Sequence, residues 1–267
     1  MISHIRKFRD QLAAGRCSLG AGVTFSDPAV SEALANVVDF LWIDLEHNPI
    51  DLGPLLGHLM AARAGGAPSL VRVPSSETSF LKRVIDTGAE GVICPQVRCA
   101  DEVRRFVSAC RYPPKGTRGW GPRRPTHYGE EPLDEYLADA EALFVCVQIE
   151  HVDAVRDIDA ILAVDGLDSI VFGPNDLSGS MNRLCHYEDP EIGEILRNVS
   201  RKAREAGVFV GSGLDADVDS AVWLAEKGVQ WLQCGCDFSY MMQAAKDLLA
   251  RTREALTMEP GEDTRRT

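Results

Sequence analysis

The chain has 267 residues, 45% of them hydrophobic, and carries a formal net charge of −12 at pH 7. That length can bury a full hydrophobic core, either in one large α/β barrel or in two small domains. The negative charge, without any lysine or arginine stripe, argues against a nucleic-acid partner. No apolar stretch approaches the length of a membrane span, and residues 1–9 are too charged for a secretory signal, so we expect a cytoplasmic protein with no membrane partner.

The sequence contains eight cysteines. Most of them, such as Cys94, Cys146 and Cys234, lie in apolar strand or helix patterns, which favours reduced packing residues over disulfides. The triplet Cys234-Gly235-Cys236 lacks the two-residue gap that zinc sites usually have, so buried thiols are the preferred interpretation there too.

Strand-like and helix-like segments alternate along the chain, after a first helix that Ser3 caps and Gly15 ends. Eight strands, each followed by a helix, within about 250 residues is the count of a (β/α)₈ barrel. An open doubly wound sheet is the alternative, but no Gly-x-Gly-x-x-Gly follows the first strand. The predicted strands are 18–23, 40–44, 69–73, 91–94, 143–149, 169–172, 208–211 and 230–234.

No domain boundary stands out, so we expect one barrel domain over residues 1–257 and a polar, disordered tail at 258–267. The one irregular stretch is 111–142, which we predict to be a long loop over the barrel mouth. The last predicted helix runs from about Tyr240 to Leu256 and carries an apolar pattern.

Two consecutive predicted strands end at an acidic group. Glu150 directly follows the strand 143–149, and Asn175 and Asp176 follow the strand 169–172 after a Gly-Pro break. Carboxylates that pack together repel one another, so such a pair usually holds a proton or a cation. We therefore predict that Glu150 and Asp176 bind a divalent metal, at the end of the barrel where catalytic groups gather.

Other strand ends carry polar groups as well: His47 follows the second strand, and Arg72 interrupts the apolar third strand. Each has a structural alternative. Arg72 could be a core arginine paired with Glu46 or Asp44, and His47 could be an ordinary loop histidine. Glu150 could cap a helix that opens at His151, and Asp176 could cap a turn ahead of Leu177. These alternatives weaken because all of the groups fall at the same end of one predicted barrel.

Five segments together resemble one enzyme family, HpcH/HpaI, whose members are metal-dependent class II pyruvate aldolases with a phosphoenolpyruvate/pyruvate-superfamily-like barrel. They are related to the hydroxy-oxoheptanedioate and dehydro-deoxy-glucarate aldolases. The resemblance extends in order from Leu19 to about Leu249. The segments are Asp44-Leu45-Glu46-His47, Val71-Arg72-Val73-Pro74, residues 111–119, Gln148-Ile149-Glu150 and Gly173-Pro174-Asn175-Asp176-Leu177-Ser178.

The resemblance implies that Glu150 and Asp176 are the metal ligands, with Gln148 beside them. Mg²⁺ or Mn²⁺ suits such a carboxylate pair, and Co²⁺ is a further candidate. The resemblance also implies that the amides around Asn175 and Asp176 hold the carboxylate of pyruvate. Leu214, just past the seventh predicted strand, looks like the family's apolar contact to pyruvate, and core packing is its alternative role.

The resemblance further implies that Arg72 faces the keto oxygen of pyruvate and that His47 is the acid/base. Asp86, placed after the third helix, matches a position that supports this histidine, in some relatives across a subunit contact. The family forms trimers or hexamers, commonly by exchanging the last helix, so a homo-oligomer with a domain-swapped C-terminal helix is expected. Two stretches depart from the family pattern, 121–125 and 181–185, and both would border the acceptor side of the site.

No lysine stands at a strand end to form a Schiff base, because Lys82 falls on a helix and Lys115 on a loop. We therefore predict reversible cleavage of a 4-hydroxy-2-oxo acid to pyruvate and an aldehyde, through a metal-stabilised pyruvate enolate. One alternative uses the same enolate for another carbon–carbon reaction, such as oxaloacetate decarboxylation or a citrate-forming condensation. The other is a non-catalytic protein that binds a small oxo acid.

Overall fold

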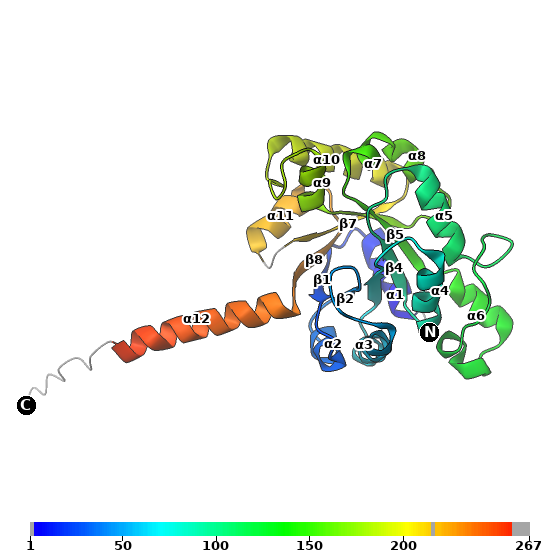
Figure 1. The fold of residues 1–267 in the computed structure, drawn as a ribbon, viewed down its shortest axis with the longest axis horizontal. Helices are drawn as coiled ribbons and strands as arrows, with labels where there is room; N and C mark the ends of the chain where they lie inside the picture. Colours follow the sequence, from blue (N-terminus) through cyan, green and yellow to red (C-terminus); the bar gives the residue numbers. More distant parts are fainter. Residues whose placement is uncertain (1–2, 215–216, 258–267) are drawn as a thin grey trace, which may run out of the picture.

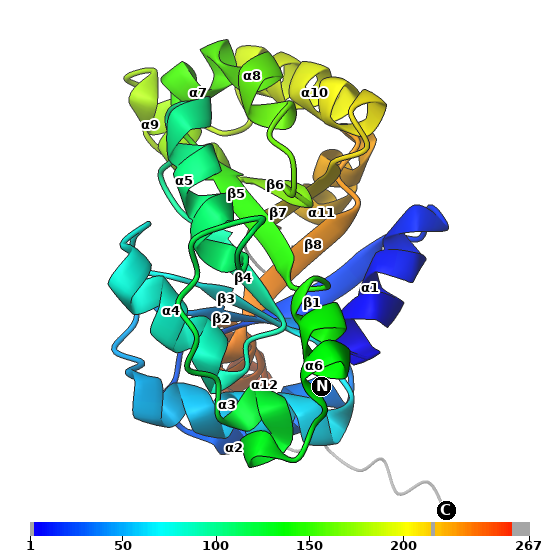
Figure 2. The ribbon, with the colours of Figure 1, turned by 90° about the vertical axis from the view of Figure 1, so that its right-hand side faces the viewer.

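The computed structural model describes residues 3–214 and 217–257. Its eight strands are all parallel to their neighbours and close into a barrel in chain order, β1 pairing with both β2 and β8 (Figures 1 and 2). The (β/α)₈ prediction is therefore confirmed, and the open sheet is excluded. The strands are β1 (Ser18–Val23), β2 (Phe40–Asp44), β3 (Ser69–Arg72), β4 (Gly91–Cys94), β5 (Phe144–Ile149), β6 (Ser169–Phe172), β7 (Phe209–Leu214) and β8 (Trp231–Cys236).

Helices connect the strands and surround the barrel, and three of the connections between strands contain more than one helix. The first seven helical segments are α1 (Ser3–Ala13), α2 (Pro28–Ala35), α3 (Leu52–Gly65), α4 (Thr78–Thr87), α5 (Ala100–Cys110), the 3₁₀ helix η1 (Arg124–Gly129) and α6 (Leu133–Ala140). The others are α7 (Val152–Arg156), α8 (Ile158–Leu162), α9 (Pro174–Ser180), α10 (Pro190–Glu205), α11 (Val218–Glu226) and α12 (Asp237–Thr257). Among the described helices, none is long and apolar enough to cross a membrane.

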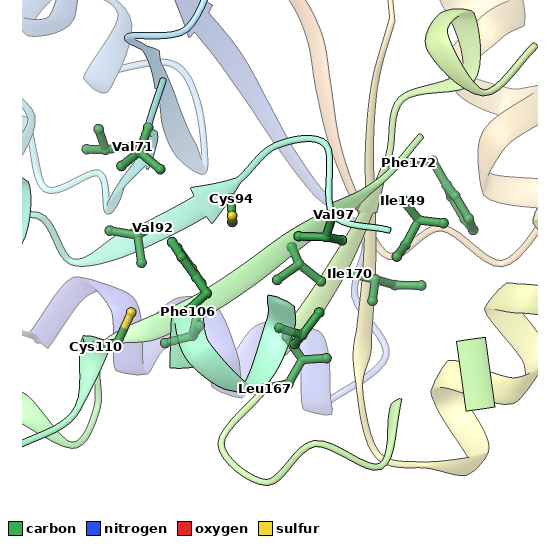
Figure 3. Packing of buried hydrophobic residues seen from close by; sticks show 14 of the residues in the cluster. Val71, Val92, Cys94, Val97, Phe106, Cys110, Ile149, Leu167, Ile170 and Phe172 are labelled. Carbon is green, nitrogen blue, oxygen red and sulfur yellow. The ribbon is translucent and has the colours of Figure 1, made fainter. Parts of the chain in front are cut away.

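Successive side chains of a strand point alternately to the outside and to the inside of the barrel, so the strands contribute to two separate hydrophobic layers. The outer faces of the strands pack against the helices, as in Figure 3, where side chains of β4 such as Val92 face Phe106 of α5. The inner layer fills the amino-terminal half of the barrel, and α1 closes it with Phe8, whose ring lies 5.4 Å from that of Phe40 and 5.5 Å from that of Phe144. The opposite, carboxyl half of the interior is left for polar groups.

The stretch 111–142 does not form the predicted loop over the barrel mouth. It connects the end of α5 to the start of β5, so it lies at the amino ends of the strands, and it contains η1 and α6. Arg124 donates there to the backbone carbonyls of Thr87 and Leu59. The prediction of a mouth loop was wrong because composition identifies an irregular segment without saying which end of the barrel it joins.

Other boundaries shift by a few residues. The seventh strand begins one residue later than predicted and extends three residues further, to Leu214, and the eighth extends to Cys236. Leu214 therefore ends β7 instead of following it. The tail predicted to be disordered, 258–267, lies outside the described residues. All eight cysteines are free thiols, but Cys234 and Cys236, which were predicted to be buried, are half-buried. The cytoplasmic location stays a prediction.

Candidate active site

A cavity of about 350 Å³ opens at the carboxyl ends of the strands. Side chains from several separate strand ends meet in it, as expected for a barrel of this type. Of the predicted site residues, His47, Arg72, Gln148, Asn175 and Asp176 all line this cavity. The other lining residues are Gly22, Thr24, Trp42, Asp44, Asn48, Phe172, Gly173, Pro174, Gly213, Gln233, Cys236 and Phe238.

Arg72 is held in the cavity wall by two carboxylates. Its Nε and Nη2 donate to the two oxygens of Asp44, each at 2.8 Å, and its Nη1 lies 3.1 Å from Glu46 Oε2. The guanidinium also stacks over the ring of Trp42, with 5.4 Å from Cζ to the ring centroid. The pairing with both carboxylates matches the structural alternative. Because a guanidinium has five N–H groups and at most three are used here, the arginine can also face a ligand.

Burial is the largest influence on the carboxyl group of Glu46, and it raises its pKa, although the charges of Arg72 and His47 oppose the shift. His47 itself points outward, with 62% of its side chain exposed, and its Nε2 lies 3.6 Å from Glu46 Oε2. An exposed imidazole at the rim, next to a carboxylate, can exchange protons with solvent and with a bound ligand.

Glu150 lies just behind the cavity wall and is buried. Burial raises the pKa of its carboxyl group to about 7, and the charges of Glu46 and Asp176 add to this shift, while a hydrogen bond from the Gln96 backbone N–H opposes it. Gln148 Nε2 donates to the second oxygen of Glu150. The structural alternative for Glu150 is wrong, because His151 caps α7 by accepting from the Asp153 N–H.

Gly173 explains how this buried carboxylate fits. A Cβ atom at Gly173 would lie 2.6 Å from Glu150 Oε2 and 2.9 Å from Gln148 Nε2, so only glycine leaves the space. Gly173 is also the N-cap residue of α9, which places Asn175 and Asp176 in the first turn of that helix, exposed to the cavity. Asp176 therefore does not cap the helix.

Two observations at this point fit a bound cation. The carboxylates of Glu150 and Asp176 repel each other, and Gln148 Oε1 is a buried oxygen without a hydrogen-bond partner among the described residues. Within residues 3–214 and 217–257, however, no three His, Cys, Asp or Glu side chains are grouped so that they could hold a metal by themselves. A cation here would thus need ligands beyond the protein's own carboxylates, which substrate and water can supply.

Besides Glu150, Asp86 is a predicted site residue that does not line the cavity of its own chain. Asp86 lies inside α4, one residue before its end, and its Oδ1 accepts from Arg118 Nη2 at 2.7 Å. Its predicted support of the histidine across a subunit contact stays a prediction. Leu214 ends β7, but its side chain lies outside the described part of the structure. Neither 121–125 nor 181–185 lines the cavity of the described chain.

Sequence reasoning missed three cavity residues: Trp42, Asn48 and Gln233. Asn48 donates to Asp44 Oδ2 at 2.6 Å and so helps to hold the carboxylate that holds Arg72. For Gln233 a signal was present, since it is a polar residue between Leu232 and Cys234, the same kind of interruption that identified Arg72.

A model of the HpcH/HpaI aldolase/citrate lyase family matches residues 24–244. The chain belongs to this family. It is 34% identical over 250 residues to the hydroxypyruvate/pyruvate aldolase of Roseovarius nubinhibens, covering 92% of this chain and 96% of that one. It is also 34% identical to the 4-hydroxy-2-oxovalerate aldolase of Rhodococcus jostii, with 94% and 97% covered. The predicted family and its class of enzyme, the carbon–carbon lyases, are therefore confirmed.

A similar barrel also carries out other chemistry. The crystal structure of the citrate synthase SbnG superimposes on this chain with a TM-score of 0.82 at 29% identity, covering 92% of this chain and 97% of that chain. Since aldolases and a citrate synthase share this fold at similar identity, the fold alone does not determine which partner a bound oxo acid reacts with.

Proposed function

We propose that this HpcH/HpaI family member is a class II aldolase that reversibly cleaves a 4-hydroxy-2-oxo acid to pyruvate and an aldehyde. The observation that carries the proposal is the meeting of Arg72, His47 and Asp176 in one cavity, with Glu150 directly behind it. The two curated relatives described above are named as aldolases, which supports it. The substrate is thus a small oxo acid.

Glu150 and Asp176 would hold the divalent cation, Mg²⁺ or Mn²⁺ and alternatively Co²⁺. When bound, the cation supplies electrostatic stabilisation to the negative charge that develops as the carbon–carbon bond breaks. Gln148, which donates to Glu150, keeps that carboxylate in place. Oxygen ligands of this kind are the ones that hard divalent cations prefer.

The chain's own residues do the rest of the chemistry. The backbone amides around Asn175 and Asp176 bind the carboxylate of pyruvate. His47 takes the proton from the aldol hydroxyl as the bond between C3 and C4 breaks. The electrons of that bond go to the enolate of pyruvate, where Arg72 stabilises the charge on the oxygen. In the condensation direction His47 returns the proton.

Chelation should separate this mechanism from an imine mechanism. Protein treated exhaustively with a chelator should keep its circular dichroism spectrum and lose its aldolase activity, and Mn²⁺ or Mg²⁺ should restore the activity. Full activity after chelation would contradict the role of the carboxylate pair. Covalent capture of pyruvate by borohydride would also contradict it, because borohydride reduces an imine, and no lysine lines the cavity within residues 3–214 and 217–257.

A second reaction through the same enolate is the alternative, either decarboxylation of oxaloacetate or a citrate-type condensation. The similarity to SbnG is the observation that favours it. Release of CO₂ without any requirement for an aldehyde would distinguish decarboxylation. A non-catalytic oxo-acid binding protein is less favoured, because a binding site has no use for an exposed acid/base such as His47 at its rim.

We further propose that the protein is a homo-oligomer, a trimer or hexamer, in which α12 packs onto a second copy. Figure 1 shows α12 leaving the barrel instead of covering it. It exposes Met241, Leu248 and Leu249, and the space beside it is a largely apolar groove of about 800 Å³ that includes Leu19 and Val222. Both the exposed face of α12 and this groove are apolar. The α12 of one copy can therefore pack into the groove of another copy. In such an assembly Asp86 would support the His47 of a neighbouring copy.

Light scattering on the full chain tests the exchange. The expected mass is three or six times 29.2 kDa. The double variant Leu248→Glu/Leu249→Glu should dissociate the assembly, and so should Val222→Glu in the groove. Each variant places a charge in an apolar contact. Arg251→Glu on the same helix is the control, since Arg251 is already polar and exposed. A monomeric wild-type protein would refute this arrangement.

A further inference from the structure

Both strands that flank β8, which are β1 and β7, carry glycines that face the barrel interior. On β1 and β7, Gly20 and Gly211 lie in the lower layer, where an added Cβ would come within 2.5 Å of the Phe40 ring and 2.0 Å of the Trp231 ring. These two glycines make room for large aromatic residues of the core. Such residues fill the barrel below the cavity, so this first pair serves packing alone.

A second pair of glycines lies one layer higher, at the cavity. A Cβ at Gly22 would lie 2.9 Å from Gln233 Nε2, and a Cβ at Gly213 would lie 2.3 Å from Gln233 Oε1. Gly213 is the direct neighbour of Gln233 in the pairing of β7 with β8. The amide of Gln233 therefore lies across the floor of the cavity. The residues beside it on β1 and β7 are glycines, so no side chain covers it.

This amide is oriented, and one of its atoms is free. Nε2 donates to the backbone carbonyl of Gly235 on the same strand, which fixes the plane of the amide. For Oε1 of Gln233, the described residues provide no hydrogen-bond partner. Because Gln233 lines the cavity, a bound molecule can reach that oxygen.

The two sides of the cavity differ in charge. The side formed by β2, β3, β5 and β6 carries Asp44, Arg72 and Asp176. Among the described residues, the side formed by β7, β8 and β1 contributes Gly213, Gln233 and Thr24 but no charged lining residue, and the hydroxyl of Thr24 already donates to Asp237. Arg72 is the only arginine or lysine that lines the cavity in the described part of the chain, and it is bound to Asp44 and Glu46.

We infer that Gln233 determines which aldehyde reacts, and that the preferred aldehyde is uncharged and carries a hydroxyl group. The inference rests on the proposed aldolase function, with pyruvate bound at the amides of Asn175 and Asp176. It adds that the aldehyde occupies the side of β7, β8 and β1. Gln233 Oε1 accepts a hydrogen bond from the hydroxyl of the aldehyde. A carboxylated aldehyde would find no cation on that side to balance its charge.

Two aldehydes of equal size test the inference, glycolaldehyde with a hydroxyl group and propionaldehyde with a methyl group in its place. The measurement is the ratio of their kcat/KM values in condensation with pyruvate and Mn²⁺, with glyoxylate as the carboxylated comparison. Wild-type protein should favour glycolaldehyde by about tenfold, the value of one hydrogen bond to an uncharged group. Gln233→Met keeps the length of the side chain and should abolish the preference. A ratio is used because a general loss of activity cancels from it.

Two further variants keep the test decisive. Gly213→Ala should lower the same ratio, because its Cβ forces the Gln233 amide to move, and it serves if Gln233→Met does not fold. Gln230→Met is the matched control, since Gln230 binds the Val210 N–H at the other end of β8 and should leave the ratio unchanged. An unchanged ratio in Gln233→Met, or a wild-type preference for propionaldehyde or glyoxylate, would overturn the inference.

Deuterium exchange separates this result from a failure of the aldolase function itself. Wild-type protein with Mn²⁺ in D₂O should exchange the methyl protons of pyruvate, which nuclear magnetic resonance detects without any aldehyde. Exchange together with an unchanged aldehyde ratio refutes the role of Gln233 alone. Absence of both exchange and condensation in the wild type refutes the proposed function and, with it, this inference.

Discussion

Replacing His47 with alanine should remove most aldol cleavage and spare much of any oxaloacetate decarboxylation. His47 follows β2, whereas the acidic pair follows β5 and β6, so the imidazole approaches from a different part of the rim. Decarboxylation forms the enolate without any proton transfer at an aldol hydroxyl. Cleavage needs that transfer, and a positioned general base typically contributes about 10²–10⁴-fold to the rate. The residual cleavage should also lose the pH dependence that an imidazole confers.

Both rates should be measured on one preparation, with the melting temperature as the control for folding. His186→Ala provides a matched variant, because His186 is exposed and does not line the cavity. Equal loss of the two activities would mean that His47 serves the shared enolate step or the fold. If neither activity falls, His47 has no part in the chemistry.

Replacing Arg72 with lysine should lower the turnover of both reactions by about 10²–10³, the usual cost of losing one donor to a developing oxyanion. The guanidinium binds Asp44 with two parallel hydrogen bonds and forms an ion pair with Glu46, whose Oε2 lies 3.1 Å from Nη1. An ammonium group cannot reproduce this planar fork and still point at a substrate oxygen. It also loses part of the stacking on Trp42.

Because Arg72 is also part of a buried ion-pair cluster, the fold needs its own measurement. Lysine keeps the positive charge next to Asp44 and Glu46, so the melting temperature should change much less than the turnover. Arg104→Lys on the exposed side of α5 is the control for the substitution itself. Near-normal turnover in Arg72→Lys would leave Arg72 with the purely structural role of a core arginine.

Much of the barrel followed from the sequence because its signals are local. Short apolar runs separated by amphipathic helices identified all eight strands, with errors of one to three residues at their ends. Polar groups that end or interrupt those runs identified Arg72, Gln148 and Asp176, which meet in one cavity. Parallel strands bring all of their carboxyl ends to one rim, so position in the strand was enough to group them.

Other features depended on contacts between distant segments, which periodicity does not encode. The stretch 111–142 lies at the amino end of the barrel because it follows a helix, and Asp86 pairs with Arg118 across 32 residues of sequence. The direction of α12 depends on the surface against which it packs. An apolar helix pattern does not show whether that surface belongs to the same chain or to a second copy. Gln233 depends on Gly22 and Gly213, two glycines on other strands, whose missing side chains leave its amide open to the cavity. The sequence by itself thus determined the barrel and the charged side of its cavity. Only the tertiary structure decided how the uncharged side is built, because that side depends on the space that glycines on β1 and β7 leave around Gln233.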